Sequence, residues 1–378
     1  MKSSFISAFL VCWFIFIGES CKKDEADAKP DFDRTALVAN IGNAIIIPAY
    51  QKLTVSVNAL DVAVATFNTA PSISNLTDLQ NKFIEAYKAW QHCSPFEFGP
   101  ADQAILNKNL NTFPVNTSKV NANIALAGNY DLEQLSNLDA KGFPAMDYML
   151  FGVASDNASI LSLYTTDNNA NNRKQYLAAL SSNIKTKSTN VLNAWMPTGG
   201  NYIDTFLKAT GTDVGSALGQ IINGLNYDLD LLKNYKVALP VGIVPSSGTQ
   251  GGAGALPQKV EAYYSGISSQ LIFIELTALQ DIYLGRSDQG DGQGLDDYLV
   301  KINAQYNNGL LNDAINNQFA AALSAVQNLP DPLSKTIQNN PNLVTSSYSQ
   351  LQQLLVLLKT DMPSSMGVLI TFEDNDGD

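Results

Sequence analysis

The sequence contains a single histidine, His92, among its 378 residues. This scarcity excludes a zinc site rich in histidine, and it excludes a Ser-His-Asp triad that works with a second catalytic histidine. His92 itself lies just past the end of a helical pattern. A lone histidine in that position is more typical of a packed polar residue, or of a partner of the helix dipole, than of a metal ligand.

Charged residues are also scarce: they make up 15% of the sequence, against about 25% in an ordinary soluble domain. The chain has 23 Lys and Arg residues and 35 Asp and Glu residues, which gives a net charge of −12. Such a charge repels phosphate backbones, so we expect no nucleic-acid partner. Hydrophobic residues reach 45%, which is enough to bury a core and excludes wholesale disorder.

The N-terminus has the order of an export signal. A basic residue is followed by an apolar run over residues 5–17, which is too short to span a bilayer as a mature helix, and Gly18 and Ser20 then precede Cys21. This arrangement resembles a bacterial lipobox, which predicts a lipoprotein signal peptide over residues 1–20 and lipidation, including palmitate, at Cys21. An ordinary signal peptide, or a signal anchor with an incidental cysteine, is the alternative.

Residues 21–31 are polar and charged and are expected to serve as a tether. The Lys, Asp and Glu residues that follow Cys21 also resemble the acidic tag of surface lipoproteins of the Bacteroidetes type. We therefore expect a lipid-anchored protein of the cell envelope, held at the outer membrane through Cys21 and facing the periplasm or the cell surface. With Cys12 removed and Cys21 lipidated, Cys93 has no disulfide partner and is expected to be a small buried residue.

Apolar residues recur at spacings of three and four over most of the remaining sequence, which predicts an all-α fold. Helical segments are expected on both sides of Pro48, and a further helix that ends at Trp90 is expected to be capped by Ser74 or Asn75. The same spacing predicts helices over residues 177–192, 214–232, 260–284, 295–329 and 343–358.

A segment rich in glycine and proline interrupts the helical pattern between Pro240 and Pro257. It is too poor in helix formers to pack as an element. A phosphate-binding loop is disfavoured, because no Lys-Ser/Thr pair follows the glycines and no strand precedes them. We predict a linker over residues 241–257, between an N-terminal helical domain over 32–240 and a C-terminal helical domain over 258–378.

Carboxylates concentrate in a glycine-rich loop over residues 288–297. Calcium loops have such a composition, but the spacing here is not that of an EF-hand, and no Glu closes the loop at the twelfth position. The pattern is more typical of a polar loop between helices in which Asp296 caps the next helix.

Six blocks of sequence stand out, at residues 86–90, 95–100, 111–115, 141–152, 294–299 and 367–372. In this order they resemble blocks of the imelysin-like lipoproteins, and they extend over nearly all of the expected mature chain. That family is described as all-helical, with two bundle-like domains packed around a cleft, so the resemblance implies the same fold. It also implies a link to iron uptake, although the family takes its name from a reported peptidase activity.

The proposed site of that family is a G-x-H-x-x-E motif, which aligns with residues 142–147. Gly142 matches the motif, but Pro144 replaces the histidine and Asp147 replaces the glutamate. A His and a Glu three residues apart share a helix face and can hold one ion. Proline offers no side-chain donor or acceptor, and the shorter stem of Asp147 retracts its oxygens by about 1.5 Å. We predict that the His-based metal site is lost or remodelled.

Asp147 and Glu97, the latter from the block at 95–100, are the candidate ligands of any remaining metal site, for iron or another divalent cation. Oxygen ligands alone suit hard ions held for binding more than they suit zinc hydrolysis. The other role open to Asp147 is a helix cap or a buried hydrogen-bond acceptor. Phe143, Met146, Tyr148 and Phe151 are expected to pack in the core.

Together, the residues and the resemblance predict a non-catalytic binding lipoprotein linked to iron or haem uptake and to the partners of that process. The alternative is a metallohydrolase or peptidase of the imelysin type, with a site built from Asp147, Glu97 and carboxylates of the second domain. Pro144 favours the binding protein, because zinc peptidase chemistry needs metal ligands and a general base. We therefore assign no catalytic residue.

Overall fold

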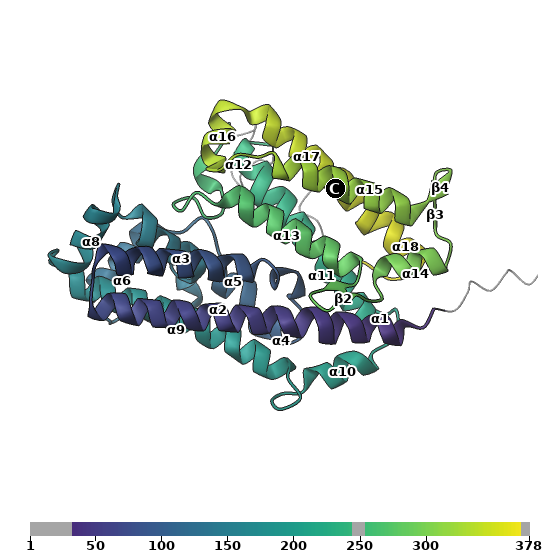
Figure 1. Cartoon of the computed structure of the whole chain (residues 1–378), viewed down its shortest axis with the longest axis horizontal. Helices are drawn as coiled ribbons and strands as arrows, with labels where there is room; N and C mark the ends of the chain where they lie inside the picture. The colour runs from purple at the N-terminus through teal and green to yellow at the C-terminus, as the bar shows by residue number, and fades with distance from the viewer. Residues whose placement is uncertain (1–31, 244–253, 372–378) are drawn as a thin grey trace, which may run out of the picture. The chain divides into compact units, whose positions relative to one another are not determined.

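The computed structural model describes residues 32–243 and 254–371. The predicted signal peptide, Cys21 and the tether up to Asp31 lie outside the described residues, as does most of the predicted linker over 241–257. Residues Phe32–Asp378 form one compact unit. Its described part is almost entirely helical, as Figure 1 shows, which confirms the predicted all-α class.

The elements before the predicted linker are helices, where η marks a 3-10 or π-helical turn. They are α1 (Arg34–Asn40), η1 (Ile41–Ile46), α2 (Ile47–Thr69), α3 (Ile73–Trp90), η2 (Ser94–Phe96), α4 (Pro100–Gln103), α5 (Leu106–Leu110), α6 (Thr117–Ala125), η3 (Leu135–Ala140), α7 (Gly142–Asp147), η4 (Tyr148–Gly152), α8 (Asn157–Thr165), α9 (Ala170–Trp195), α10 (Tyr202–Lys208), α11 (Ala217–Leu231), η5 (Leu232–Ala238) and α12 (Leu239–Val241).

The elements after it include two short hairpins. They are η6 (Pro257–Lys259), α13 (Ser268–Tyr283), β1 (Arg286–Ser287), β2 (Gly290–Asp291), α14 (Leu295–Lys301), β3 (Gln305–Tyr306), β4 (Gly309–Leu310), α15 (Leu311–Gln327), α16 (Leu333–Asn339), α17 (Pro341–Val356), η7 (Leu357–Asp361) and α18 (Met362–Met366).

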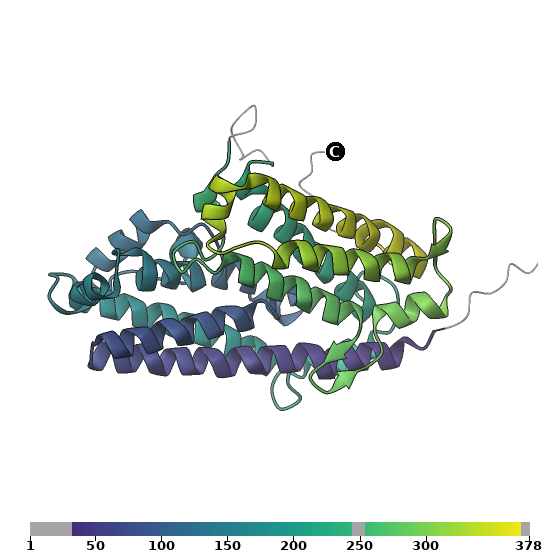
Figure 2. The ribbon, with the colours of Figure 1, turned by 45° about the horizontal axis from the view of Figure 1, so that its top comes forward.

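Helix α2 organises the N-terminal helices, because it packs lengthwise against both α3 and α9 (Figures 1 and 2). Its apolar residues recur at spacings of three and four and form one stripe. Leu53, Val57, Leu60 and Val64 of this stripe are each at most 1% exposed. The π-helical turn η1 precedes Pro48 and joins the two expected segments into one continuous helix.

A second group of helices consists of α13, α15 and α17, against which α11 and η5 also pack. Since η5 precedes residues 241–257 and α13 follows them, helices from both sides of the predicted linker share this packing. The limits of the two predicted domains stay a prediction. Among the helices of the described ranges, none is both long and apolar enough to span a membrane.

Two of the expected helices were wrong in extent. The helix expected over 295–329 is divided, because the β3–β4 hairpin lies between α14 and α15. Asn307, with a φ of +52°, and Asn308 form the two-residue turn between these strands, and asparagine favours tight hairpin turns. The helix expected over 260–284 begins only at Ser268.

Two predicted helix caps were also wrong. Helix α3 is capped by Ser72, whose hydroxyl accepts a hydrogen bond from the N–H of Asn75 at 3.2 Å. Helix α14 begins after Gly294 rather than at Asp296, and Asp297 accepts a hydrogen bond from the N–H of Gly294 at 3.0 Å. In both cases the capping residue lies slightly earlier in the sequence than the predicted one.

The apolar stripe of α2 predicts the stability of two variants. Leu60 is fully buried, so Leu60→Ala should lower the free energy of unfolding by about 2–5 kcal/mol through lost burial and a residual cavity. Val62 on the same helix is 66% exposed, and Val62→Ala should change it by no more than about 0.5 kcal/mol. Urea unfolding followed by circular dichroism measures both, and equal effects would contradict this packing.

Candidate functional site

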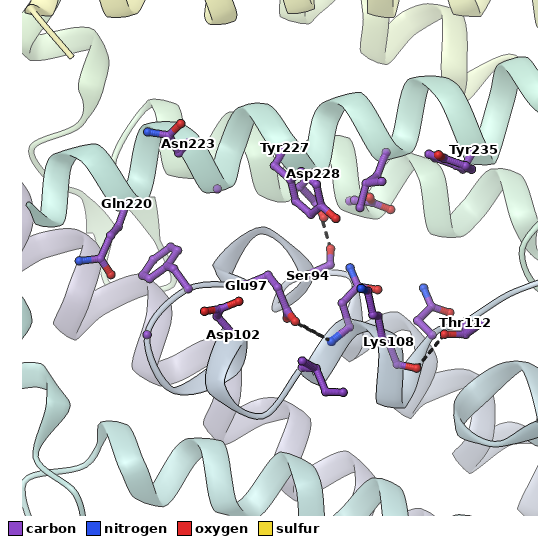
Figure 3. Close-up of a pocket in the computed structure, with 18 of the residues that line it drawn as sticks. Ser94, Glu97, Asp102, Lys108, Thr112, Gln220, Asn223, Tyr227, Asp228 and Tyr235 are labelled. Atoms are coloured by element: carbon purple, nitrogen blue, oxygen red, sulfur yellow. Dashed lines mark hydrogen bonds between the residues drawn. The ribbon is translucent and has the colours of Figure 1, made fainter. Parts of the chain in front are cut away.

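A cavity of about 830 Å³ lies between the segment 94–113 and the helix formed by α11 and η5. We call it the Tyr227 cavity. Figure 3 shows Glu97 and Asp102 on one side of it, opposite Tyr227 and Asp228 on α11. Its walls also include the aromatic residues Phe98, Phe113 and Tyr235.

Close backbone packing shapes this cavity. Gly224 of α11 lies against η2, and a Cβ at this position would stand only 2.5 Å from the carbonyl oxygen of Pro95. Ile105, at the opposite wall, has a φ of +42°. A β-branched residue in the left-handed region is strained, and such strain persists only where the surrounding structure enforces it.

A buried network of charged and amide side chains forms the floor of the Tyr227 cavity. Lys236 of η5 pairs with Glu275 of α13, and its Nζ lies 2.9 Å from Oε2 of Glu261. Lys236 also donates a hydrogen bond of 2.9 Å to Gln91, and Asn111 donates one of 2.7 Å to Glu261. All three charged residues are at most 4% exposed.

The charges of this floor act strongly on one another because water is excluded. Burial lowers the pKa of Lys236, but Glu261, Glu275 and Asp228 together outweigh burial and leave the pKa raised. Burial raises the pKa of Glu275 well above its usual value, although Lys236 opposes this change. Lys236 is therefore charged at neutral pH, and its charge is engaged within the protein.

Two further carboxyl groups face the cavity beside this floor. Both oxygens of Glu97 accept from the N–H of Asn107, at 3.1 and 3.2 Å, and Asp228 accepts from the hydroxyl of Ser94 at 3.2 Å. Burial raises the pKa of Glu97 to about 8, because the hydrogen bond from Asn107 offsets only part of the effect of burial. Burial also raises the pKa of Asp228 to about 6, while Lys236 lowers it.

Asp147 lies in a different and smaller cavity of about 240 Å³, which we call the Asp147 cavity. Its Oδ2 accepts a hydrogen bond from the N–H of Tyr264 at 2.9 Å, and its Oδ1 accepts one from the N–H of Ser265 at 3.0 Å. Burial raises the pKa of Asp147 to about 6, against the effect of these hydrogen bonds. Each oxygen thus already serves as a buried hydrogen-bond acceptor.

Pro144 lines the same cavity and lies in the first turn of the short helix α7. A proline fits there because the N–H groups of a first turn have no partner within the helix. Gly142, at the start of α7, has a φ of +72°, and a Cβ at this position would lie 2.3 Å from the carbonyl oxygen of Leu110. Only glycine fits this conformation and this close approach of two backbones.

The structure places the two candidate metal ligands, Asp147 and Glu97, in different cavities. Within residues 32–243 and 254–371, no group of three or more His, Cys, Asp or Glu side chains is arranged to hold a metal ion. Phe143 and Met146 are fully buried, as expected, whereas Tyr148 and Phe151 are only partly buried and pack against the edge of the core. Cys93 is buried too, and burial raises the pKa of its thiol.

Lys236, Glu261 and Glu275 were not predicted from the sequence. A signal was present for Glu275, which stands alone within an otherwise apolar run of α13. Carboxylates are seldom fully buried unless they are paired, so an isolated one in such a run predicts a buried partner. The identity of that partner could not be predicted, because Lys236 belongs to a different helix.

Gly142 offers a test of the backbone approach at the motif. Gly142→Ala should lower the free energy of unfolding by about 3 kcal/mol or more, because it combines a left-handed alanine with a clash against Leu110. Gly367 has a nearly equal φ of +70°, and a Cβ at that position would meet no atom within 4 Å, so Gly367→Ala carries the backbone strain alone. Urea unfolding measures both variants, and an equal loss of unfolding free energy in Gly142→Ala and Gly367→Ala would contradict the clash.

Comparison with solved structures supports this architecture. A crystal structure of a candidate iron-regulated protein A precursor from Parabacteroides distasonis ATCC 8503 superposes with a TM-score of 0.73 at 20% identity, over 90% of this chain and 97% of that one. An imelysin-like protein from Psychrobacter arcticum 273-4 superposes with a TM-score of 0.68 at 20% identity, over 91% and 100%. The chain therefore has the fold of these proteins.

Sequence comparison points in the same direction. The chain is 21% identical over 300 residues to iron-regulated protein A of Synechococcus elongatus (strain ATCC 33912 / PCC 7942 / FACHB-805), which covers 78% of this chain and 75% of the relative. The family model described as Imelysin matches residues 46–358. Because this match covers most of the sequence, the chain belongs to the imelysin family.

Proposed function

We propose that this protein is a cell-envelope lipoprotein with a non-catalytic binding role linked to iron or haem uptake. Its membership of the imelysin family and its similarity to iron-regulated protein A support the link to iron. The observation that carries the non-catalytic role lies at the motif. Pro144 stands where the family has histidine, and both oxygens of Asp147 accept hydrogen bonds from backbone N–H groups.

This arrangement disfavours a hydrolase. A metal-dependent hydrolase needs ligands with free lone pairs and a general base beside the bound water. Pro144 supplies neither, which leaves Asp147 without a histidine beside it and with one backbone hydrogen bond already made by each of its oxygens. The carboxylate-based alternative would need Asp147 and Glu97 to converge, whereas they line separate cavities. The geometry supports a binding protein better than it supports a peptidase.

The Tyr227 cavity supports a binding role directly. Its volume of about 830 Å³ falls within the range of about 300–1,000 Å³ that is typical of small-molecule sites. Its lining combines aromatic and aliphatic residues with many polar and charged ones, so it can contact both the apolar and the polar parts of a ligand. The proposed anchor is a lipid on Cys21, with residues 21–31 as the tether that leads to the folded unit.

Asp147→Asn tests the role of the motif. An asparagine can accept from only one of the two N–H groups and turns an N–H₂ group toward the other, so the free energy of unfolding should fall by about 1–3 kcal/mol. Asp78→Asn, at an exposed position of α3, is the control and should leave stability unchanged. The wild type, Asp147→Asn and Asp78→Asn should have the same affinity for iron and for zinc in calorimetric titration. None of the three should cleave a peptide library.

Two outcomes would contradict the proposal. One is metal binding by the wild type that Asp147→Asn abolishes and Asp78→Asn retains. The other is peptide cleavage that a chelator inhibits. Circular dichroism of each variant shows whether it is folded, so that a loss of binding through unfolding is recognised.

The anchor is tested by labelling cells with radioactive palmitate. The wild type should incorporate the label and sediment with membranes, because Cys21 is the proposed site of acylation. Cys21→Ala should carry no label, whereas Cys93→Ala should keep it, since Cys93 is buried. Label that persists in Cys21→Ala, or a wild type without label, would contradict the lipid anchor.

A further inference from the structure

The Tyr227 cavity carries an excess of negative charge. Its lining contains more carboxyl groups than ammonium groups, and the only lysines among its lining residues are Lys108 and Lys236. Lys108 lies at an exposed position of α5 and acts on Glu97. The carboxyl groups of the lining are those of Glu97, Asp102, Asp228 and Glu275.

The lysine at the floor is not available to an anionic ligand. Lys236 pairs with Glu275 and Glu261 and donates a hydrogen bond to Gln91. Separating a buried ammonium from its partners to serve a ligand would cost several kcal/mol. An anion in the cavity would therefore meet four carboxyl groups and, of the two lining ammonium groups, only that of Lys108, so the electrostatics disfavour anionic ligands.

Glu97 and Asp228 lie on opposite sides of the cavity (Figure 3). The hydrogen bonds that hold them come from neutral donors, the N–H of Asn107 and the hydroxyl of Ser94. Their raised pKa values have burial as the largest cause, and the neighbouring carboxylates add to it. A positive charge between them would offset this cost and favour their ionised forms.

The walls between these carboxyl groups are suited to an organic body. Tyr227 and Tyr235 from the α11–η5 helix, and Phe98 and Phe113 from the opposite segment, line the cavity. Aromatic faces attract ammonium and guanidinium groups and also pack against apolar carbon. A bare metal ion fits less well, because the described residues hold no group of three or more suitable ligands.

We propose that the Tyr227 cavity binds an organic cation, a small molecule with an ammonium or guanidinium group on an apolar or aromatic body. The charged group lies between Glu97 and Asp228, and the body packs against the aromatic walls. This proposal does not depend on the iron-related function, because it requires no metal, and the two are tested with different probes.

Isothermal titration calorimetry of the purified protein tests the proposal with tyramine and agmatine as cations and 4-hydroxyphenylacetate as the anion that matches tyramine in size. At least one amine should bind, and the anion should not. Glu97→Gln keeps an acceptor for the N–H of Asn107 and should weaken amine binding about tenfold or more. Glu85→Gln, on the exposed face of α3, should leave it unchanged.

Several results would overturn the proposal. They are the absence of binding by both amines at millimolar concentration, equal binding of 4-hydroxyphenylacetate, or amine binding that Glu97→Gln leaves unchanged. Tighter binding of calcium chloride than of either amine would assign the cavity to a metal ion instead. Circular dichroism of Glu97→Gln confirms that the variant is folded before its affinity is compared.

Discussion

The buried ammonium group of Lys236 connects several parts of the fold. Glu261 and Glu275 pair with it, and Gln91 accepts a hydrogen bond from it. Lys236 of η5 thus connects α13, the segment before α13 and the C-terminal end of α3. A buried ion pair adds little net stability compared with apolar packing, but removal of one partner leaves an unpaired charge in a dry interior at a cost of about 3–5 kcal/mol. Its main effect here is to specify how the helices meet.

Both cavities follow from this arrangement. Glu275 and Lys236 form the floor of the Tyr227 cavity, and they set the charge against which Asp228 titrates. Glu261 lies just before the residues whose N–H groups hold Asp147, namely Tyr264 and Ser265. Asn111, which donates to Glu261, connects the network to Tyr87 on α3. The network thus connects the surroundings of Asp147 with the floor of the Tyr227 cavity.

The sequence predicted the helical class and the long helices α9 and α17, because amphipathic spacing over many residues is a strong signal. It did not predict the hairpins, which depend on single Asn and Gly residues, or the π-helical turns, one of which carries Lys236. The loss of the motif histidine could be recognised at Pro144 itself. The partners of Asp147 could not, because Tyr264 lies 117 residues further along the chain and is brought near only by tertiary packing.

The central claim is that Asp147 is a structural acceptor rather than a metal ligand. Crystals soaked with iron or zinc and measured at the absorption edge of each metal test this claim most directly. The account predicts no anomalous peak at the carboxylate of Asp147, with the N–H groups of Tyr264 and Ser265 still at hydrogen-bond distance. An anomalous peak at coordination distance from Asp147, with those hydrogen bonds broken, would contradict it.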